Sequence, residues 1–259
     1  MPLHIQVHQA DAIDLCEAQQ DATVDVIITD PPYWTLDRWR NVGTTTRLGG
    51  HRNRDQQRDE MWFETIDQDY LWRLFLEFDR ILKLDGHLYV FCDDRVAPIL
   101  LHWIREAKDE HRFGDAHQLI WDKVHMGMGY HYRRAYECIV FTWREKREGV
   151  GGFKPRKLAD LGQPDIFRSI PRIARGKATY PTEKPPALIG KLLFQSGAEL
   201  VGGVFFDPFA GSGVLAAATP FSWDKSTVIL GDKSPAAIAH MKRRFADMHL
   251  FGAEVKFLP

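Results

Sequence analysis

The segment Asp30-Pro31-Pro32-Tyr33 follows an apolar, β-branched run, Val24–Ile28. Such a run, when it ends in turn residues, is typical of a buried parallel strand, and open α/β sheets bind ligands where these strands end. Each proline fixes its own φ and lacks an N–H, so the turn is stiff and presents mainly acceptors, the Asp30 carboxylate and backbone carbonyls. Two acceptors beside an aromatic ring suit a planar base that donates both hydrogens of an exocyclic amino group.

A second candidate site lies far downstream, where the strand-like run Val204–Phe206 leads into Asp207-Pro208-Phe209-Ala210-Gly211-Ser212-Gly213 and then an alanine-rich helix. A strand, a glycine turn and a helix N-terminus in this order bring the backbone close to a nucleotide-like ligand. The next apolar run, Thr227–Gly231, ends at Asp232, where a carboxylate can hold both ribose hydroxyls. The turn has two glycines instead of the three of a dinucleotide site, so NAD is the poorer interpretation.

These motifs resemble those of the amino-methyltransferases that move a methyl group from S-adenosylmethionine to N6 of adenine or N4 of cytosine in DNA, whose signature is D-P-P-Y. Thr182-Glu183-Lys184-Pro185 resembles the family's T-E-K-P element. Gln9-Ala10-Asp11-Ala12 resembles its G-D-A element, with alanine in place of glycine. The catalytic motif precedes the glycine motif, which is similar to the circularly permuted order of the β class.

The resemblance implies S-adenosylmethionine as cofactor and double-stranded DNA as substrate, with the target base flipped out of the duplex. The Asp30 carboxylate and the Pro31 carbonyl would accept the two amino hydrogens, and Tyr33 would stack on the base. The D-P-P-Y form is associated mainly with adenine, so a site-specific N6-adenine enzyme is expected. The implied catalytic residues are Asp30, Pro31, Pro32 and Tyr33, and the implied cofactor-binding residues are Asp11, Ala12, Thr182, Lys184, Asp207, Phe209, Gly211, Ser212, Gly213 and Asp232.

Three alternative functions remain open. Two acceptors and a ring serve N4 of cytosine as well as N6 of adenine. Methylation of RNA or of a glutamine amide is associated in the family more with N-P-P-Y. A catalytically silent, nucleic-acid-binding relative is a third alternative, although the intact acid at Asp30, the glycines and Asp232 argue against it. The T-E-K-P segment can also be an ordinary helix start, with Thr182 as N-cap of a helix at 187–196.

Basic residues are concentrated in two segments, although the formal net charge is only −1. Residues 34–60 follow the catalytic turn, carry five arginines and no acid between Arg38 and Arg54, and are expected to form a mobile basic loop. Residues 143–178 are a candidate target-recognition insertion, because they occupy the place that this region has in the β class. A solvated polar loop is the alternative for both segments. The residues expected to bind DNA are Arg38, Arg40, Arg47, Arg52, Arg54, Arg133, Lys154, Arg156 and Lys157.

The pattern of apolar residues predicts one α/β domain, 1–259, with a doubly wound, methyltransferase-type (Rossmann-like) sheet and an antiparallel hairpin at one edge. Helical spacing predicts helices over 69–82, 96–108 and 235–248. The seven expected strands are 4–8, 24–29, 87–91, 118–121, 138–143, 204–207 and 227–231, with an additional terminal strand at 254–258.

The composition indicates where in the cell the protein is expected and whether disulfides or metal ions are expected. The chain has no apolar stretch of membrane-spanning length, and its N-terminus resembles a strand and not a signal peptide, so a cytoplasmic protein of bacterial, archaeal or phage-encoded type is expected. Three unclustered cysteines suggest neither a disulfide framework nor a zinc site, and no metal is expected. The family resemblance is compatible with a homodimer.

Overall fold

In the computed structural model, the described residues are 2–39, 64–126, 131–145, 158–173, 180, 182–197, 202–220, 222–223, 225–248 and 252–258. Most of the basic loop predicted at 34–60 and much of the candidate insertion at 143–178 therefore lie outside the described residues. The same holds for the side chain of Arg38 and for Arg40, Arg47, Arg52, Arg54, Lys154, Arg156 and Lys157.

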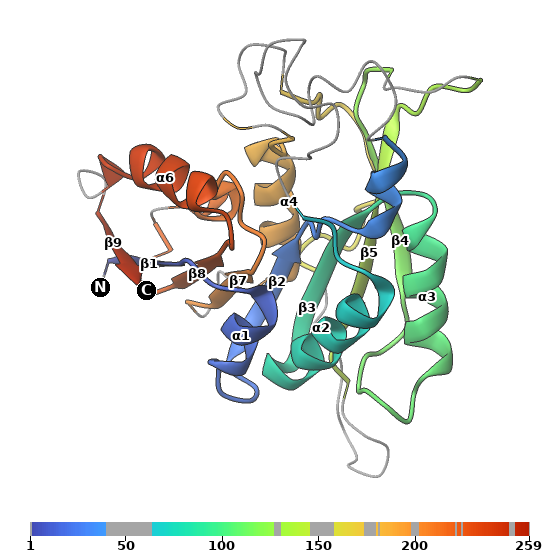
Figure 1. The fold of residues 1–259 in the computed structure, drawn as a ribbon, viewed down its shortest axis with the longest axis horizontal. Coiled ribbons are helices and arrows are strands. Elements are labelled where there is room, and N and C mark those ends of the chain that lie inside the picture. Colours follow the sequence, from blue (N-terminus) through green and yellow to red (C-terminus); the bar gives the residue numbers. More distant parts are fainter. Residues whose placement is uncertain are drawn as a thin grey trace.

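One sheet of nine strands runs through the described residues in the order β6-β4-β5-β3-β2-β7-β8-β1-β9 (Figure 1). Every neighbouring pair is parallel except that β5 runs antiparallel to both β3 and β4. The strands are β1 (Leu3–His8), β2 (Val24–Thr29), β3 (Leu82–Cys92), β4 (His117–Asp122), β5 (Tyr136–Trp143), β6 (Ile166–Phe167), β7 (Val204–Asp207), β8 (Thr227–Gly231) and β9 (Ala253–Leu258).

The doubly wound sheet and the antiparallel hairpin are confirmed. All seven predicted strands are present, and the terminal strand that was expected in addition is β9. The ninth strand, β6, was not predicted, because two residues show no periodicity. It pairs with β4 through Ile120 and Ile166, so part of the candidate insertion belongs to the edge of the sheet.

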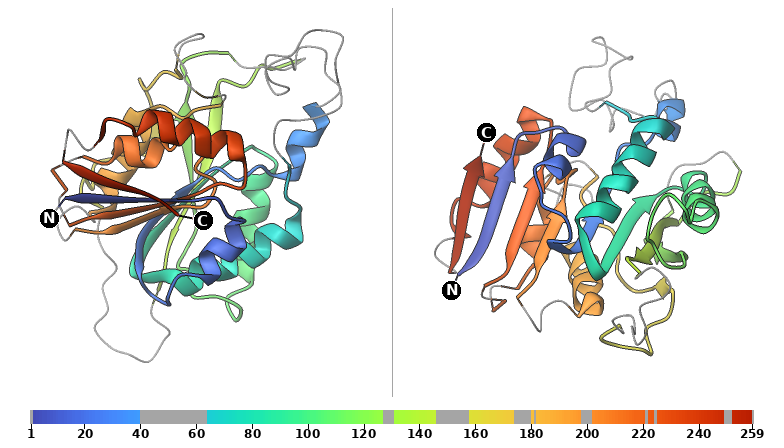
Figure 2. Two further views of the ribbon diagram at one scale, coloured as in Figure 1. Left: turned by 60° about the vertical axis from the view of Figure 1, so that its left-hand side comes forward. Right: turned by 90° about the horizontal axis from the view of Figure 1, so that it is seen from below.

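Helices cover both faces of the sheet (Figure 2). The helices α1 (Ala12–Glu17), α2 (Gln68–Ile81) and α3 (Val96–Glu106) pack on one face, and α4 (Pro186–Ser196), α5 (Val214–Ala218) and α6 (Pro235–Arg244) pack on the other. Neither α1 nor the 3-10 helix η1 (Trp34–Trp39) was predicted, since each has only six residues. Within the described residues, no helix is long and apolar enough to cross a membrane.

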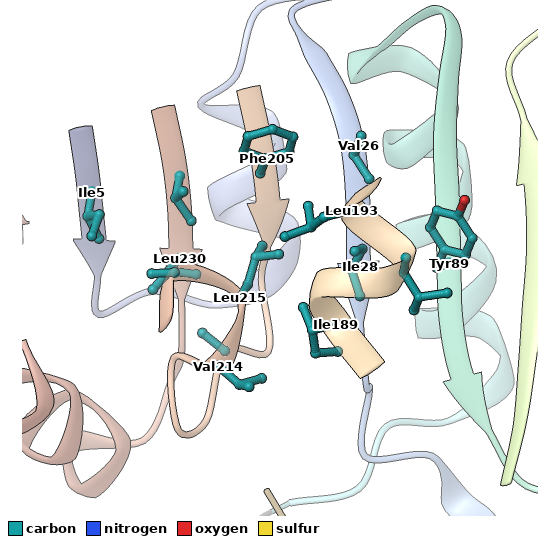
Figure 3. Close-up of a cluster of buried hydrophobic side chains, with 14 of the residues drawn as sticks. Ile5, Val26, Ile28, Tyr89, Ile189, Leu193, Phe205, Val214, Leu215 and Leu230 are labelled. Carbon is teal, nitrogen blue, oxygen red and sulfur yellow. The ribbon is translucent and has the colours of Figure 1, made fainter. Parts of the chain in front are cut away.

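Side chains alternate along the strands and divide the core into two layers. Ile28 of β2 and Phe205 of β7 lie in the same cluster as Leu193 of α4 (Figure 3). Ile27 and Phe206, which neighbour them in the sequence, pack with the helices of the opposite face. Because β2 is covered on both sides, all six of its residues are buried, and the chain reaches solvent only where the strand ends.

The pairing of strands brings the two predicted sites together. β2 lies parallel to β7, with Val26 opposite Phe205 and Ile27 opposite Phe206. β7 is in turn parallel to β8, and β8 to β1. The carboxyl ends of all four strands therefore meet at one edge of the sheet, where the catalytic turn and the glycine turn lie side by side.

The glycine at the start of α5 allows a close contact with α6. Gly213 has φ +70°, and a Cβ there would lie 2.5 Å from Cζ of Phe245 and 3.0 Å from Cγ of Met241. We expect Gly213→Ala to lower the free energy of unfolding by roughly 2–4 kcal/mol, since backbone strain and overpacking add. Gly252 has φ +86° with nothing within 4 Å, so Gly252→Ala should cost only about 1 kcal/mol. Urea denaturation measures both, and equal losses would contradict the proposed packing.

Candidate active site

The D-P-P-Y turn leaves β2 and is held by its own carbonyl groups. The Pro31 carbonyl accepts the Tyr33 N–H at 3.0 Å, and the Pro32 carbonyl accepts the Ile66 N–H at 2.8 Å. A carbonyl oxygen has two lone pairs, so the Pro31 carbonyl can accept a second hydrogen bond. Tyr33 is only 8% exposed and packs in the core, so stacking on a base would require its ring to become accessible.

The Asp30 carboxylate is paired with a lysine from a distant part of the chain. Oδ2 of Asp30 contacts Nζ of Lys184, and this ammonium also lies 5.1 Å from the centre of the Phe91 ring. Burial raises the pKa of Asp30, Lys184 opposes that rise, and Glu137 adds to it. Burial would lower the pKa of Lys184, but the two carboxylates outweigh burial and raise it. The lysine is therefore a cation held between acids.

The second acid beside Lys184 comes from the β4–β5 hairpin. Oε2 of Glu137 lies 3.3 Å from Nζ of Lys184, and Oε1 lies 3.2 Å from Nζ of Lys123. Burial favours the neutral form of Glu137, yet the two lysines outweigh it and lower the pKa. Neither Glu137 nor Lys123 was among the predicted site residues. The sequence offered only a weak signal for them, because each is a single charged residue at one end of an apolar strand.

Two acids organise the glycine turn. Asp232 accepts the Gly211 N–H on Oδ2 and the Ser234 N–H on Oδ1, both at 2.8 Å. Asp207 accepts the Phe209 N–H at 3.1 Å. Asp207 is 6% exposed, and burial raises its pKa to about 7. Burial also raises the pKa of Asp232. The predicted residues of this motif are thus brought together around a backbone turn.

The T-E-K-P segment links the glycine turn with the catalytic turn. Glu183 pairs with Arg244 of α6 at 2.5 Å, and Arg244 donates to the Ser212 carbonyl at 3.1 Å. The next residue, Lys184, pairs with Asp30. The expectation that Thr182 caps the following helix is wrong. α4 begins at Pro186 with Pro185 as its N-cap, and Thr182 lies before this cap, exposed and with φ +59°.

The predicted acid near the N-terminus caps the helix that follows β1. Oδ1 of Asp11 accepts the Ile13 N–H at 3.0 Å and the Tyr70 hydroxyl at 2.5 Å. Burial and the hydrogen bond to Asp11 raise the pKa of Tyr70. Ala12 is the first residue of α1 and is buried. Tyr70 was missed because it comes from α2, and no local pattern relates it to Asp11.

Arg133 and Arg144, which both lie in or near the predicted basic regions, have different environments in the structure. Arg133, which was predicted to contact DNA, is exposed. Arg144, the first arginine of the candidate insertion, is 8% exposed, lies 3.6 Å from Asp79 and donates to the Leu82 carbonyl. Arg144 is therefore part of the interior. Among the described residues, no group of three histidines, cysteines or acids is arranged to hold a metal ion.

Comparison with known proteins identifies a family that the chain matches over most of its length. Residues 24–220 match the sequence model of a family described as DNA methylase. The DNA adenine methyltransferase YhdJ of Escherichia coli (strain K12) is 25% identical over 217 residues, which cover 73% of this chain. The match covers 66% of that enzyme, just under two thirds of its length.

Solved structures share the fold. TTHA0409 from Thermus thermophilus, a candidate DNA modification methylase complexed with S-adenosyl-L-methionine, has a TM-score of 0.63 at 21% identity. The alignment covers 98% of this chain and 99% of that protein. The PvuII DNA methyltransferase, named as cytosine-N4-specific, has a TM-score of 0.60 at 13% identity, with 98% and 96% of the two chains covered. At these identities the likeness shows the fold alone.

Proposed function

The chain belongs to the DNA methylase family, and we propose that it moves a methyl group from S-adenosylmethionine to an exocyclic amino nitrogen of a base in double-stranded DNA. The observation that carries the proposal is the position of the D-P-P-Y turn and the glycine turn at the ends of adjacent parallel strands, β2 and β7. This arrangement supports the proposal, because an acceptor for an amino group would then lie beside a turn suited to a nucleoside.

The residues around the glycine turn fit such a cofactor. Each oxygen of Asp232 already accepts one backbone N–H and retains a lone pair for a ribose hydroxyl. The buried Asp207 carboxylate suits a ligand with positive charge. When bound, S-adenosylmethionine supplies an electrophilic methyl group on a positively charged sulfur. We infer that the other contacts are Asp11, Ala12, Thr182, Lys184, Phe209, Gly211, Ser212 and Gly213.

The D-P-P-Y turn would activate the amino group of the base. The lone pair of an aromatic amine is delocalised into the ring, and hydrogen-bond acceptors on both N–H groups favour the pyramidal form that attacks a methyl group. Asp30 and the free lone pair of the Pro31 carbonyl are those acceptors. Pairing with Lys184 favours the ionised form of Asp30, which is the stronger acceptor.

We propose N6 of adenine as the methylated atom, because this chain carries Asp at position 30 and because YhdJ is named a DNA adenine methyltransferase. N4 of cytosine is the second candidate, because cytosine presents the same kind of exocyclic amino group to the two acceptors. Double-stranded DNA is the proposed partner of the basic segments. A homodimer remains an expectation from the sequence.

The reaction product tests the proposed function. We expect N6-methyladenine after incubation of the protein with unmethylated double-stranded DNA and S-adenosylmethionine, because the D-P-P-Y form at Asp30–Tyr33 is associated mainly with adenine. Mass spectrometry of the digested nucleosides detects it, with Asp30→Ala as the inactive control. N4-methylcytosine alone would contradict the choice of base, and the absence of any methylated base would contradict the function.

The two acids at the strand ends should have separable roles. Asp30→Ala should reduce methyl transfer by at least about 100-fold with cofactor affinity retained. Asp232→Ala should weaken cofactor binding by about 10- to 100-fold, because it loses the ribose acceptor and the two backbone hydrogen bonds of the turn. Titration calorimetry compares the affinities. An equal loss of affinity in both variants would show that the roles are assigned wrongly.

Cofactor affinity should depend on pH through Asp207. A cationic ligand binds better to an ionised carboxylate, and the pKa of Asp207 is raised to about 7, so affinity should increase as the pH rises through this value. Calorimetry at about pH 6 and pH 8 measures the change. Asp207→Asn is the matched control, in which any remaining pH dependence comes from the ligand. The same pH dependence in both proteins would refute the role of Asp207.

A further inference from the structure

Four charged side chains form a row of alternating sign, in the order Asp30, Lys184, Glu137 and Lys123. Lys184 contacts Asp30 and lies 3.3 Å from Glu137, whose other oxygen lies 3.2 Å from Lys123. The four residues come from the end of β2, the segment before α4, the start of β5 and the end of β4. The pairing of separate elements, and not local sequence, therefore creates the row.

This arrangement bears on the step in which a substrate amine reaches Asp30. In the structure, Lys184 occupies Oδ2 of that carboxylate, so the amine must compete with an ammonium group. Lys184 is only 11% exposed, and a buried cation that loses its partner is strongly unfavourable. Glu137 is the other carboxylate that contacts it among the described residues. The lysine can shift toward Glu137 and remain paired.

We propose that Glu137 is a positioning residue that keeps Lys184 paired while Asp30 turns to the substrate amine. This inference rests on the proposed function. Lys123 binds the other oxygen of Glu137 and so limits how strongly Glu137 attracts Lys184. Lys184 is thereby shared between two carboxylates. Neither Glu137 nor Lys123 needs to touch the substrate for this role.

The proposal predicts shifts of opposite sign in the titration of Asp30. Glu137 raises the pKa of Asp30, so Glu137→Gln should lower it. Lys123→Met should raise it, because Glu137 then draws Lys184 away from Asp30. Among the described residues, the other titratable groups that interact with Asp30 are Asp207, Tyr33 and Cys92. They are unchanged in both variants and contribute equally.

NMR titration of carboxyl-labelled aspartate measures these shifts without any substrate, with Asp30→Asn to assign the signal. We expect a shift on the order of half a pH unit or more in each direction. Glu254→Gln and Lys256→Met remove the same charges from an ion pair on β9, at the opposite edge of the sheet, and should shift nothing. Lys123→Arg should restore the behaviour of the original protein. Melting curves identify a variant that does not fold, in which case the sign in the other variant decides.

Methyl-transfer kinetics give the second readout. In Glu137→Gln, Lys184 keeps Asp30 as its single carboxylate partner, so kcat should fall by about 10- to 100-fold with cofactor affinity unchanged. The acid limbs of the two pH profiles should move in opposite directions. The proposal would be overturned if the pKa of Asp30 shifted in the same direction in both variants, or if its shifts were no larger than those in the β9 control variants. Opposite NMR shifts in a protein that methylates no DNA would support the shared lysine and refute the proposed function.

Discussion

Parallel pairing of β2 with β7 is the constraint on which the site depends. It places the end of an entirely buried strand, and hence Asp30, next to the turn that contains Gly211 and Gly213. The two segments are far apart in the sequence, and their order along the chain does not affect the result. A permuted chain keeps the same site as long as these two strands remain neighbours and run in the same direction.

Electrostatic balance then determines what each acid can do. Asp30, Asp207 and Asp232 lie at the ends of adjacent strands, and burial raises the pKa of each. Asp30 alone among them has a lysine partner, whereas Asp207 and Asp232 bind backbone N–H groups. Under the proposed function, the paired carboxylate of Asp30 would accept hydrogens from an amine, and the acids at the other two strand ends would favour a cationic ligand.

Much of this could be predicted from the sequence, because the strands that position the site are short apolar runs that end in distinctive turns. Val24–Thr29, Val204–Asp207 and Thr227–Gly231 begin and end where they were expected. The partners of the site residues were not predictable. Glu137 and Tyr70 reach Lys184 and Asp11 through strand pairing and helix packing, which leave no local pattern in the sequence. Arg144, at the start of the candidate insertion, is likewise fixed in the interior by contacts that its local sequence does not indicate.

The pairing of Asp30 with Lys184 also limits what Asp30 can contribute to the choice of base. A carboxylate held by an ammonium group is an acceptor for any exocyclic amino group, and adenine and cytosine both present one. If the chain methylates a base as proposed, discrimination would come from the space around that base, because a pocket shaped for the larger ring would hold the smaller one poorly. In the proposed reaction, the D-P-P-Y turn would supply the acceptors for the amino group, and the walls around it would determine which base is methylated.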